Sequence, residues 1–107
     1  MNTLISLINL FRRSGLVESL RAFSEQYCRK NPNWTAYQVH MGRDLSTDAA
    51  INCLARVRLE IRARQEIEQR FEVASCGQEL SGLIQAERLL RRFLLDRRIK
   101  EIEYFAS

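Results

Sequence analysis

Residues 46–74 contain no glycine and no proline, and this uninterrupted segment constrains the fold more than any other feature of the sequence. Its centre, residues 55–64, alternates between apolar and charged residues, a pattern typical of a half-buried strand. Two strands would have to turn near Gln65 and Glu66, which do not readily adopt the positive φ of a tight hairpin turn. Because strong helix formers dominate the segment, we expect one long helix.

The ends and faces of the segment also fit a helix. Ser46 or Thr47 can cap its start, and Gly77 is suited to a left-handed turn after Cys76. Apolar residues would then form a main face and a second row on a neighbouring face, and we expect both to be buried. The main face comprises Ala50, Cys53, Leu54, Val57 and Ile61, and the second row comprises Leu59, Ala63, Ile67 and Phe71.

Apolar residues at helical spacing predict further helices over residues 3–13, 16–30 and 78–104. Pro32 ends the second of these, because the residue before a proline is disfavoured in a helix. Residues 34–41 fit either a short helix or a strand, and we favour the helix. The sequence thus predicts an all-α protein, a small helical bundle with two short N-terminal helices and a long C-terminal αα-hairpin. Residues 1–107 suit a single domain.

The cysteines, Cys28, Cys53 and Cys76, are odd in number and too widely spaced for a structural zinc site. We therefore expect free thiols in a reducing compartment. The apolar run near the N-terminus is shorter than the ~20 residues of a membrane crossing, and its positive charge follows the run. We expect a cytoplasmic protein with no membrane association.

Catalytic motifs are not recognisable in this sequence. His40 is the single histidine, and no nucleophile–base pattern accompanies it. The glycines do not form a phosphate-binding loop, and the carboxylates alternate with arginines at intervals of four, which would hold their pKa values low. We expect a protein that is not an enzyme and that binds no metal and no cofactor.

The sequence has seventeen basic and thirteen acidic residues, so its net charge of +4 is modest. If the long segments are helical, most arginines lie one turn from a carboxylate, as in Glu60–Arg64 and Glu87–Arg91. Residues 88–98 nevertheless carry a local excess of positive charge, because they hold five arginines and one acid, Asp96. This arginine cluster is the strongest basic feature of the chain.

The pattern favours a small protein-binding regulator or inhibitor that uses a helix face, for example an anti-activator that blocks a bacterial transcription regulator. The length of the hairpin also predicts a homodimer. We expect the partner-binding residues in the first helix and in the arginine cluster. They are Leu7, Leu10, Phe11, Arg88, Arg91, Arg92 and Arg98.

The alternative is a nucleic-acid-binding transcriptional regulator that uses the arginines of residues 88–98, or a phage-type inhibitor of a host nucleic-acid machine. No helix-turn-helix spacing or zinc finger is recognisable beside that cluster. For the first helix, the alternative is that Leu7 and Leu10 are ordinary core residues.

Overall fold

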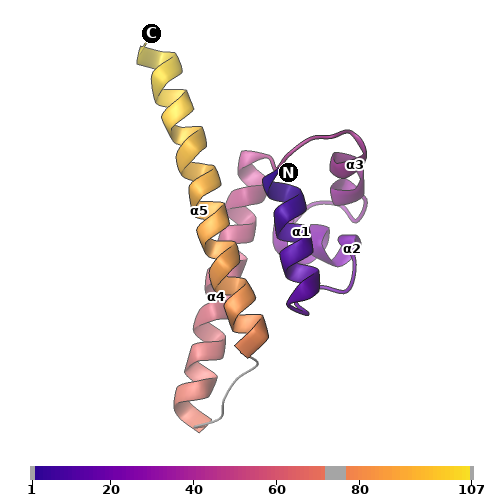
Figure 1. Cartoon of the computed structure of the whole chain (residues 1–107), viewed down its shortest axis with the longest axis vertical. Helices are drawn as coiled ribbons and strands as arrows, with labels where there is room; N and C mark the ends of the chain where they lie inside the picture. Colours follow the sequence, from indigo (N-terminus) through magenta and orange to yellow (C-terminus); the bar gives the residue numbers. More distant parts are fainter. Residues whose placement is uncertain (1, 72–76, 107) are drawn as a thin grey trace.

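The computed structural model describes residues 2–71 and 77–106, with side chains up to residue 98, and no strand occurs in these ranges. This confirms the all-α prediction. The helices in chain order are α1 (Thr3–Arg13), α2 (Leu20–Ala22), the π-helix η1 (Phe23–Cys28), α3 (Trp34–His40), α4 (Thr47–Phe71) and α5 (Gly77–Ala106). The long helices α4 and α5 run side by side as a hairpin, and the shorter helices pack against one side of it (Figure 1).

The core lies where α1 and η1 meet the long helices. Three aromatic rings form its centre: Phe11 packs edge-on against Phe23 and Tyr27, with ring centroids 5.3 and 4.6 Å away. Val57 from α4 and Leu90 from α5 are fully buried against the same core. The alternating segment is therefore a helix, and the main face predicted for it is the buried one, although Leu54 and Ile61 are only partly covered.

The start of α1 is fixed by two side chains. Asn2 caps the helix by accepting the backbone N–H of Ile5 at 2.9 Å. The carboxylate of Asp44 accepts the N–H of Leu4 at 2.8 Å, although Asp44 lies forty residues further along the chain. The loop between α3 and α4 is therefore tied to the first turn of α1, where a negative charge is favourable.

Two predicted elements differ from the structure. Residues 16–30 were expected to form one α-helix, but α2 begins only at Leu20 and continues as the π-wound η1. Gly77 was expected in a left-handed turn, but it is the first residue of α5 and its φ is not positive. Cys76 lies outside the described residues.

The second apolar row of α4 is exposed, which corrects the prediction that it is buried. Leu59, Ile67 and Phe71 are 62, 51 and 67% exposed. The short helices lie beside the part of α4 nearer its start, where η1 makes the main contact with it, so this row faces solvent (Figure 1). It leaves a large unpaired apolar stripe on the hairpin.

One close contact sets the spacing between α1 and α5. A Cβ placed on Gly82 would lie 2.2 Å from the hydroxyl oxygen of Ser14 and 2.5 Å from its Cβ. Only glycine fits there without displacing the end of α1. In the part of the chain that the structure describes, no helix is both long enough and apolar enough to cross a membrane.

Candidate functional site

The predicted contact residues of the first helix lie in the core. Leu7, Leu10 and Phe11 are 0, 4 and 0% exposed. They form the face of α1 that packs against the rest of the bundle, so they are not available to a partner in this fold. This placement corrects the expectation that they form a binding surface.

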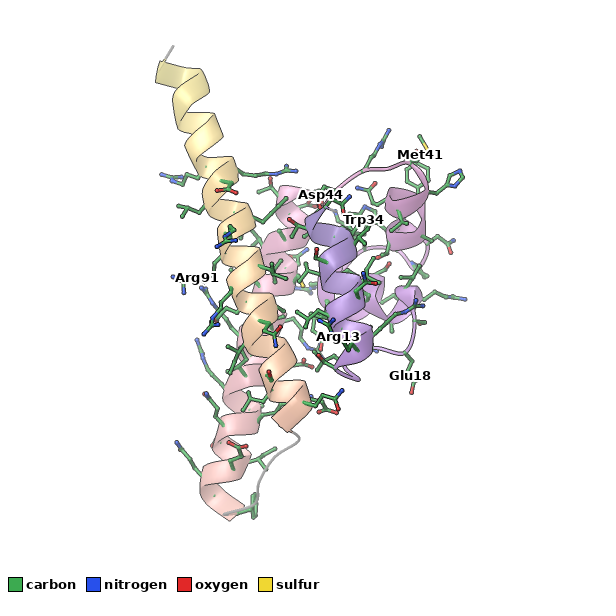
Figure 2. The ribbon with its side chains drawn as sticks, viewed as in Figure 1. Arg13, Glu18, Trp34, Met41, Asp44 and Arg91 are labelled. Carbon is green, nitrogen blue, oxygen red and sulfur yellow. The ribbon has the colours of Figure 1, made fainter. Side chains whose placement is uncertain are left out.

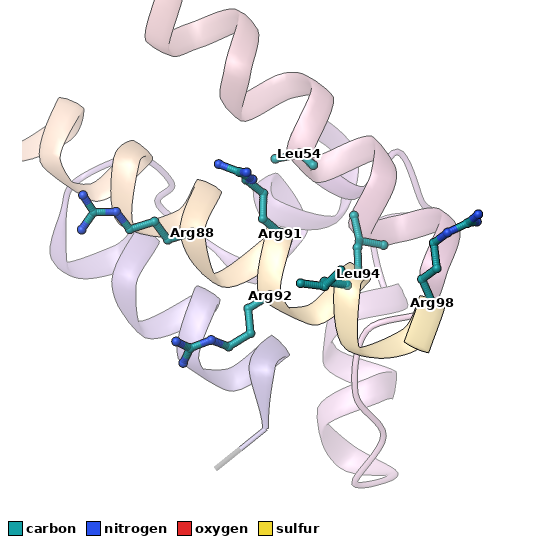
Figure 3. Close-up of a pocket in the computed structure, with 7 residues that line it drawn as sticks. Leu54, Arg88, Arg91, Arg92, Leu94 and Arg98 are labelled. Atoms are coloured by element: carbon teal, nitrogen blue, oxygen red, sulfur yellow. The ribbon is translucent and has the colours of Figure 1, made fainter. Parts of the chain in front are cut away.

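The predicted arginines, in contrast, come together on one surface. Arg88, Arg91, Arg92 and Arg98 are all exposed, and at ~100° per residue they fall within about 120° of one another around α5. They line a groove of about 470 Å³ between α4 and α5. We name it the arginine groove, and its lining comprises Leu54 of α4 and Arg88, Arg91, Arg92, Leu94, Leu95 and Arg98 of α5. Figure 3 shows Arg91 reaching from α5 toward Leu54.

Several other arginines of the hairpin have partners within the fold. Arg97 donates to the carbonyl of Leu45 at 2.9 Å, and its guanidinium lies over the Phe93 ring at 4.6 Å. Glu87, which was expected to pair with Arg91, instead pairs with Arg58 of α4 at 3.3 Å. That change leaves Arg91 exposed at the groove.

A second candidate surface was not predicted. The short helices α2, η1 and α3 follow one another and are separated only by a turn of residues 29–33. Arg29 begins the turn in the left-handed conformation, with φ at 55°. Two short packed helices joined by a turn resemble a helix-turn-helix, although the turn here, residues 29–33, is longer than the usual three or four residues. We name α2, η1, the turn and α3 the helix-turn-helix unit.

A buried polar contact locks the two helices of this unit together. The hydroxyl of Ser24, on η1, accepts the backbone N–H of Thr35 at 3.0 Å and also bonds the Thr35 hydroxyl. Both residues are completely buried. Ser24 therefore caps the first turn of α3 from a different helix, while the N-cap residue Asn33 makes no side-chain cap bond.

Further contacts hold the unit on the hairpin. Asn52 of α4 donates to the carbonyl of Cys28 at 3.0 Å, at the end of η1. Lys30 in the turn pairs with Asp48 at the start of α4, and its hydrogen bond lowers the pKa of that carboxyl to about 2. The turn and both its helices are thus fixed relative to α4.

The outer face of α3 is open to solvent. Ala36, Tyr37, Val39 and His40 are exposed, and the guanidinium of Arg43 lies over the Tyr37 ring at 5.7 Å. Residues 19–43 contain four basic residues and one acid. Met41, just after α3, and Arg91, on α5, lie on opposite sides of the molecule (Figure 2). The helix-turn-helix unit and the arginine groove are therefore separate surfaces.

The sequence analysis did not predict this unit, because the apolar pattern of residues 16–30 predicts one continuous helix. The available signal was a pair of segments, nine and seven residues long, on either side of Asn31-Pro32-Asn33. A second signal was the presence of polar residues on the helix faces that the apolar pattern turns toward the core. Ser24, Thr35 and Gln38 are all buried, and Gln38 donates to the carbonyl of Asp44 at 3.0 Å.

Within the described residues, the two thiols, of Cys28 and Cys53, are buried, and the histidine lies at the surface. Burial raises the pKa of the Cys28 thiol to about 12 and also raises the pKa of Cys53, so both are protonated at neutral pH. His40 is exposed. Among the residues that the structure describes, no group of three histidine, cysteine or acidic side chains is placed to hold a metal ion.

Comparison with curated proteins and with solved structures found no match. A family model does match, and it covers residues 4–100, which include α1 except for its first residue, α2 to α4, both candidate surfaces and most of α5. The chain therefore belongs to a family of unknown function, DUF6626.

Proposed function

We propose that the protein is a small cytoplasmic regulator that binds double-stranded DNA through the helix-turn-helix unit and has no catalytic activity. The observation that carries the proposal is the packing of η1 on α3, with Ser24 capping α3 and its opposite face exposed. In helix-turn-helix proteins the second helix lies in the major groove and the first crosses the backbone. Here α3 would be the helix in the groove.

The side chains around α3 suit this role. Asn31, Asn33 and His40 are exposed on the turn and on α3, and amide side chains can bond the major-groove edge of adenine in a bidentate manner. Arg29 and Arg43 flank them and would contact phosphates. The small residue Ala36 allows close approach to a base edge or a thymine methyl group.

A homodimer fits this proposal, because helix-turn-helix proteins commonly bind two half-sites ~34 Å apart. The exposed stripe of α4, with Leu59, Ile67 and Phe71, is the surface we assign to the second copy. Charges of both signs flank it, including the Glu66–Arg70 pair at 3.2 Å, so two copies of the stripe do not repel. Light scattering of the purified protein tests this assignment.

The second candidate is the protein-binding regulator or inhibitor expected from the sequence, which includes the anti-activator role. Two observations favour it. Tyr37, Val39 and Met41 expose apolar surface on and beside α3, which a protein partner would cover better than DNA. The arginine groove offers a second surface on the far side of the molecule.

The DNA proposal is tested by selecting binding sites from a random duplex library and measuring their affinity by fluorescence anisotropy. Binding should weaken about 100-fold between 50 and 200 mM salt, as expected for about four phosphate contacts. Arg43→Glu should weaken binding to all duplexes and reduce the salt dependence by about one phosphate contact. Arg91→Glu, the same charge change on the opposite side, is the matched control and should leave binding nearly unchanged.

Three outcomes contradict the proposal. No enriched duplex, or an affinity independent of salt, removes DNA as the ligand. Binding that is lost in Arg91→Glu but retained in Arg43→Glu assigns nucleic acid to the arginine cluster instead.

A further inference from the structure

We propose that the arginine groove binds an acidic, amphipathic helix of a partner protein. This inference does not depend on DNA binding, because the groove and α3 lie on different sides of the molecule (Figure 2). It assigns a ligand chemistry to the four arginines that the sequence singled out.

The groove combines an apolar floor with a cationic rim. Leu54, Leu94 and Leu95 form the floor, and Leu95 is 59% exposed. Arg88 and Arg98 lie at the two ends (Figure 3). An isolated exposed leucine is ordinary on a protein surface. Leu95, however, is surrounded on one helix face by four arginines, so this surface can make both apolar contacts and charged hydrogen bonds.

The guanidinium N–H groups of the rim arginines can donate hydrogen bonds to a partner. Within the side chains that the structure describes, no carboxylate pairs with Arg88, Arg91 or Arg92, whereas Arg58 pairs with Glu87 on the same hairpin. An arginine binds a carboxylate through two parallel hydrogen bonds, which gives both strength and geometry. Acidic side chains of a partner would satisfy donors that now face solvent.

Charge excludes a second copy as the occupant of this groove. Two such surfaces facing each other would bring the arginine rims together, and like charges across an interface are strongly unfavourable. A nucleic acid would neutralise the arginines through its phosphates but would leave the apolar floor uncovered. A helix with leucine-like residues on one face and acidic residues beside them satisfies both parts of the groove.

The groove also has a natural extension. A second hollow of about 640 Å³, lined by Leu80, Ile84 and Gln85 among others, shares Arg88 with the first. Together they follow α5 from Gly77 to Arg98, roughly 30 Å at ~1.5 Å per residue. A partner helix of about 20 residues would fill this length. Its acidic end would lie against Arg98, and its more apolar end against Leu80 and Ile84.

The test is a selection of random 20-residue peptides displayed against the whole protein, followed by anisotropy with the synthesised winners. Enriched peptides should carry apolar residues three and four apart, with aspartate or glutamate beside them. Arg91→Glu and Leu95→Ser should each weaken binding at least tenfold. Arg62→Glu, an exposed arginine of α4 outside the groove, and Arg43→Glu on the DNA-facing side should change it less than twofold. Thermal unfolding by circular dichroism confirms that each variant is folded.

Four outcomes overturn the inference. They are the absence of any peptide whose binding depends on both Arg91 and Leu95, enrichment of basic peptides, equal binding of a scrambled acidic peptide, and displacement of the peptide by a DNA duplex whose own binding is lost in Arg91→Glu. The first three outcomes do not involve DNA, so they overturn this inference and leave the DNA proposal standing. The fourth outcome contradicts both proposals.

Discussion

The hydroxyl of Ser24 accepts the backbone N–H of Thr35 at 3.0 Å and so connects the π-helix η1 to the first turn of α3. The two residues are eleven positions apart and completely buried. Buried polar groups of this kind are stabilising only while each has its partner. The orientation of α3 therefore depends on this contact.

Replacement of Ser24 by alanine should lower the free energy of unfolding by about 1–3 kcal/mol, because the N–H and the hydroxyl of Thr35 lose their partner. Urea unfolding measures the effect. The double variant Ser24→Ala/Thr35→Val should cost less than the sum of the two single changes, since the two hydroxyls bond each other. Strictly additive costs would show that the contact is not an energetic unit.

Replacement of Gly82 by alanine should destabilise the protein by about 1–3 kcal/mol, because its Cβ would overlap Ser14 at the end of α1. Gly77→Ala is the matched control: nothing lies within 4 Å of that position, so the change should be neutral or slightly stabilising. Thermal and urea unfolding distinguish the two. The additional change Ser14→Gly should recover most of the loss in Gly82→Ala, and a failure to recover would place the clash elsewhere.

Truncation of Leu90, which is fully buried, should cost about 2–5 kcal/mol. The same change at Leu95, five residues later on the exposed face of α5, should cost less than ~0.5 kcal/mol. Leu54→Ala should fall between them, because Leu54 is only partly buried at the edge of the arginine groove. Equal costs for Leu90 and Leu95 would contradict the placement of α5.

The sequence predicted the long helices because their apolar residues have a 3.6-residue period and no glycine or proline interrupts residues 46–74. It also brought Arg88, Arg91, Arg92 and Arg98 to one face, since that follows from spacing alone. It did not predict which apolar rows would be covered. Leu10 and Leu59 lie on equally apolar rows, and only the tertiary arrangement buries the first and exposes the second.

The geometry of the helix-turn-helix unit could not be predicted for a related reason. The π-winding of residues 23–28 and the left-handed Arg29 are responses to packing, and no local preference requires them. The burial of Ser24 and Thr35 depends on the contact between their hydroxyls, which the sequence pattern does not show. The unit is defined by contacts between helices, and hydrophobic periodicity carries no information about such contacts.

Stability should fall at alkaline pH because of the buried thiols of Cys28 and Cys53. Below about pH 8.5 both the folded and the unfolded chain keep these thiols protonated, so they add no pH dependence. Above it the unfolded chain loses the protons while the folded chain retains them, because burial raises both pKa values, that of Cys28 to about 12. The free energy of unfolding should then decrease by up to about 1.4 kcal/mol per pH unit for each thiol.

Urea unfolding at pH 7.5, 9 and 10 measures this slope. Cys28→Ala and Cys53→Ala should each reduce it, whatever they do to stability at pH 7.5. A slope that is unchanged in both variants would assign the alkaline loss to other groups, such as Tyr27, whose pKa is also raised by burial.

Asn52 and Leu54 lie two positions apart on α4, so they point to nearly opposite sides of the helix. Asn52 holds the end of η1, and Leu54 lines the arginine groove. The helix α4 therefore contacts both units: one side of it holds the end of η1, and the other side contributes Leu54 to the arginine groove. A protein bound at the arginine groove would be held at a fixed distance and angle from a DNA duplex bound at the helix-turn-helix unit. In that arrangement the protein would act as an adaptor that fixes the position of one bound molecule relative to another.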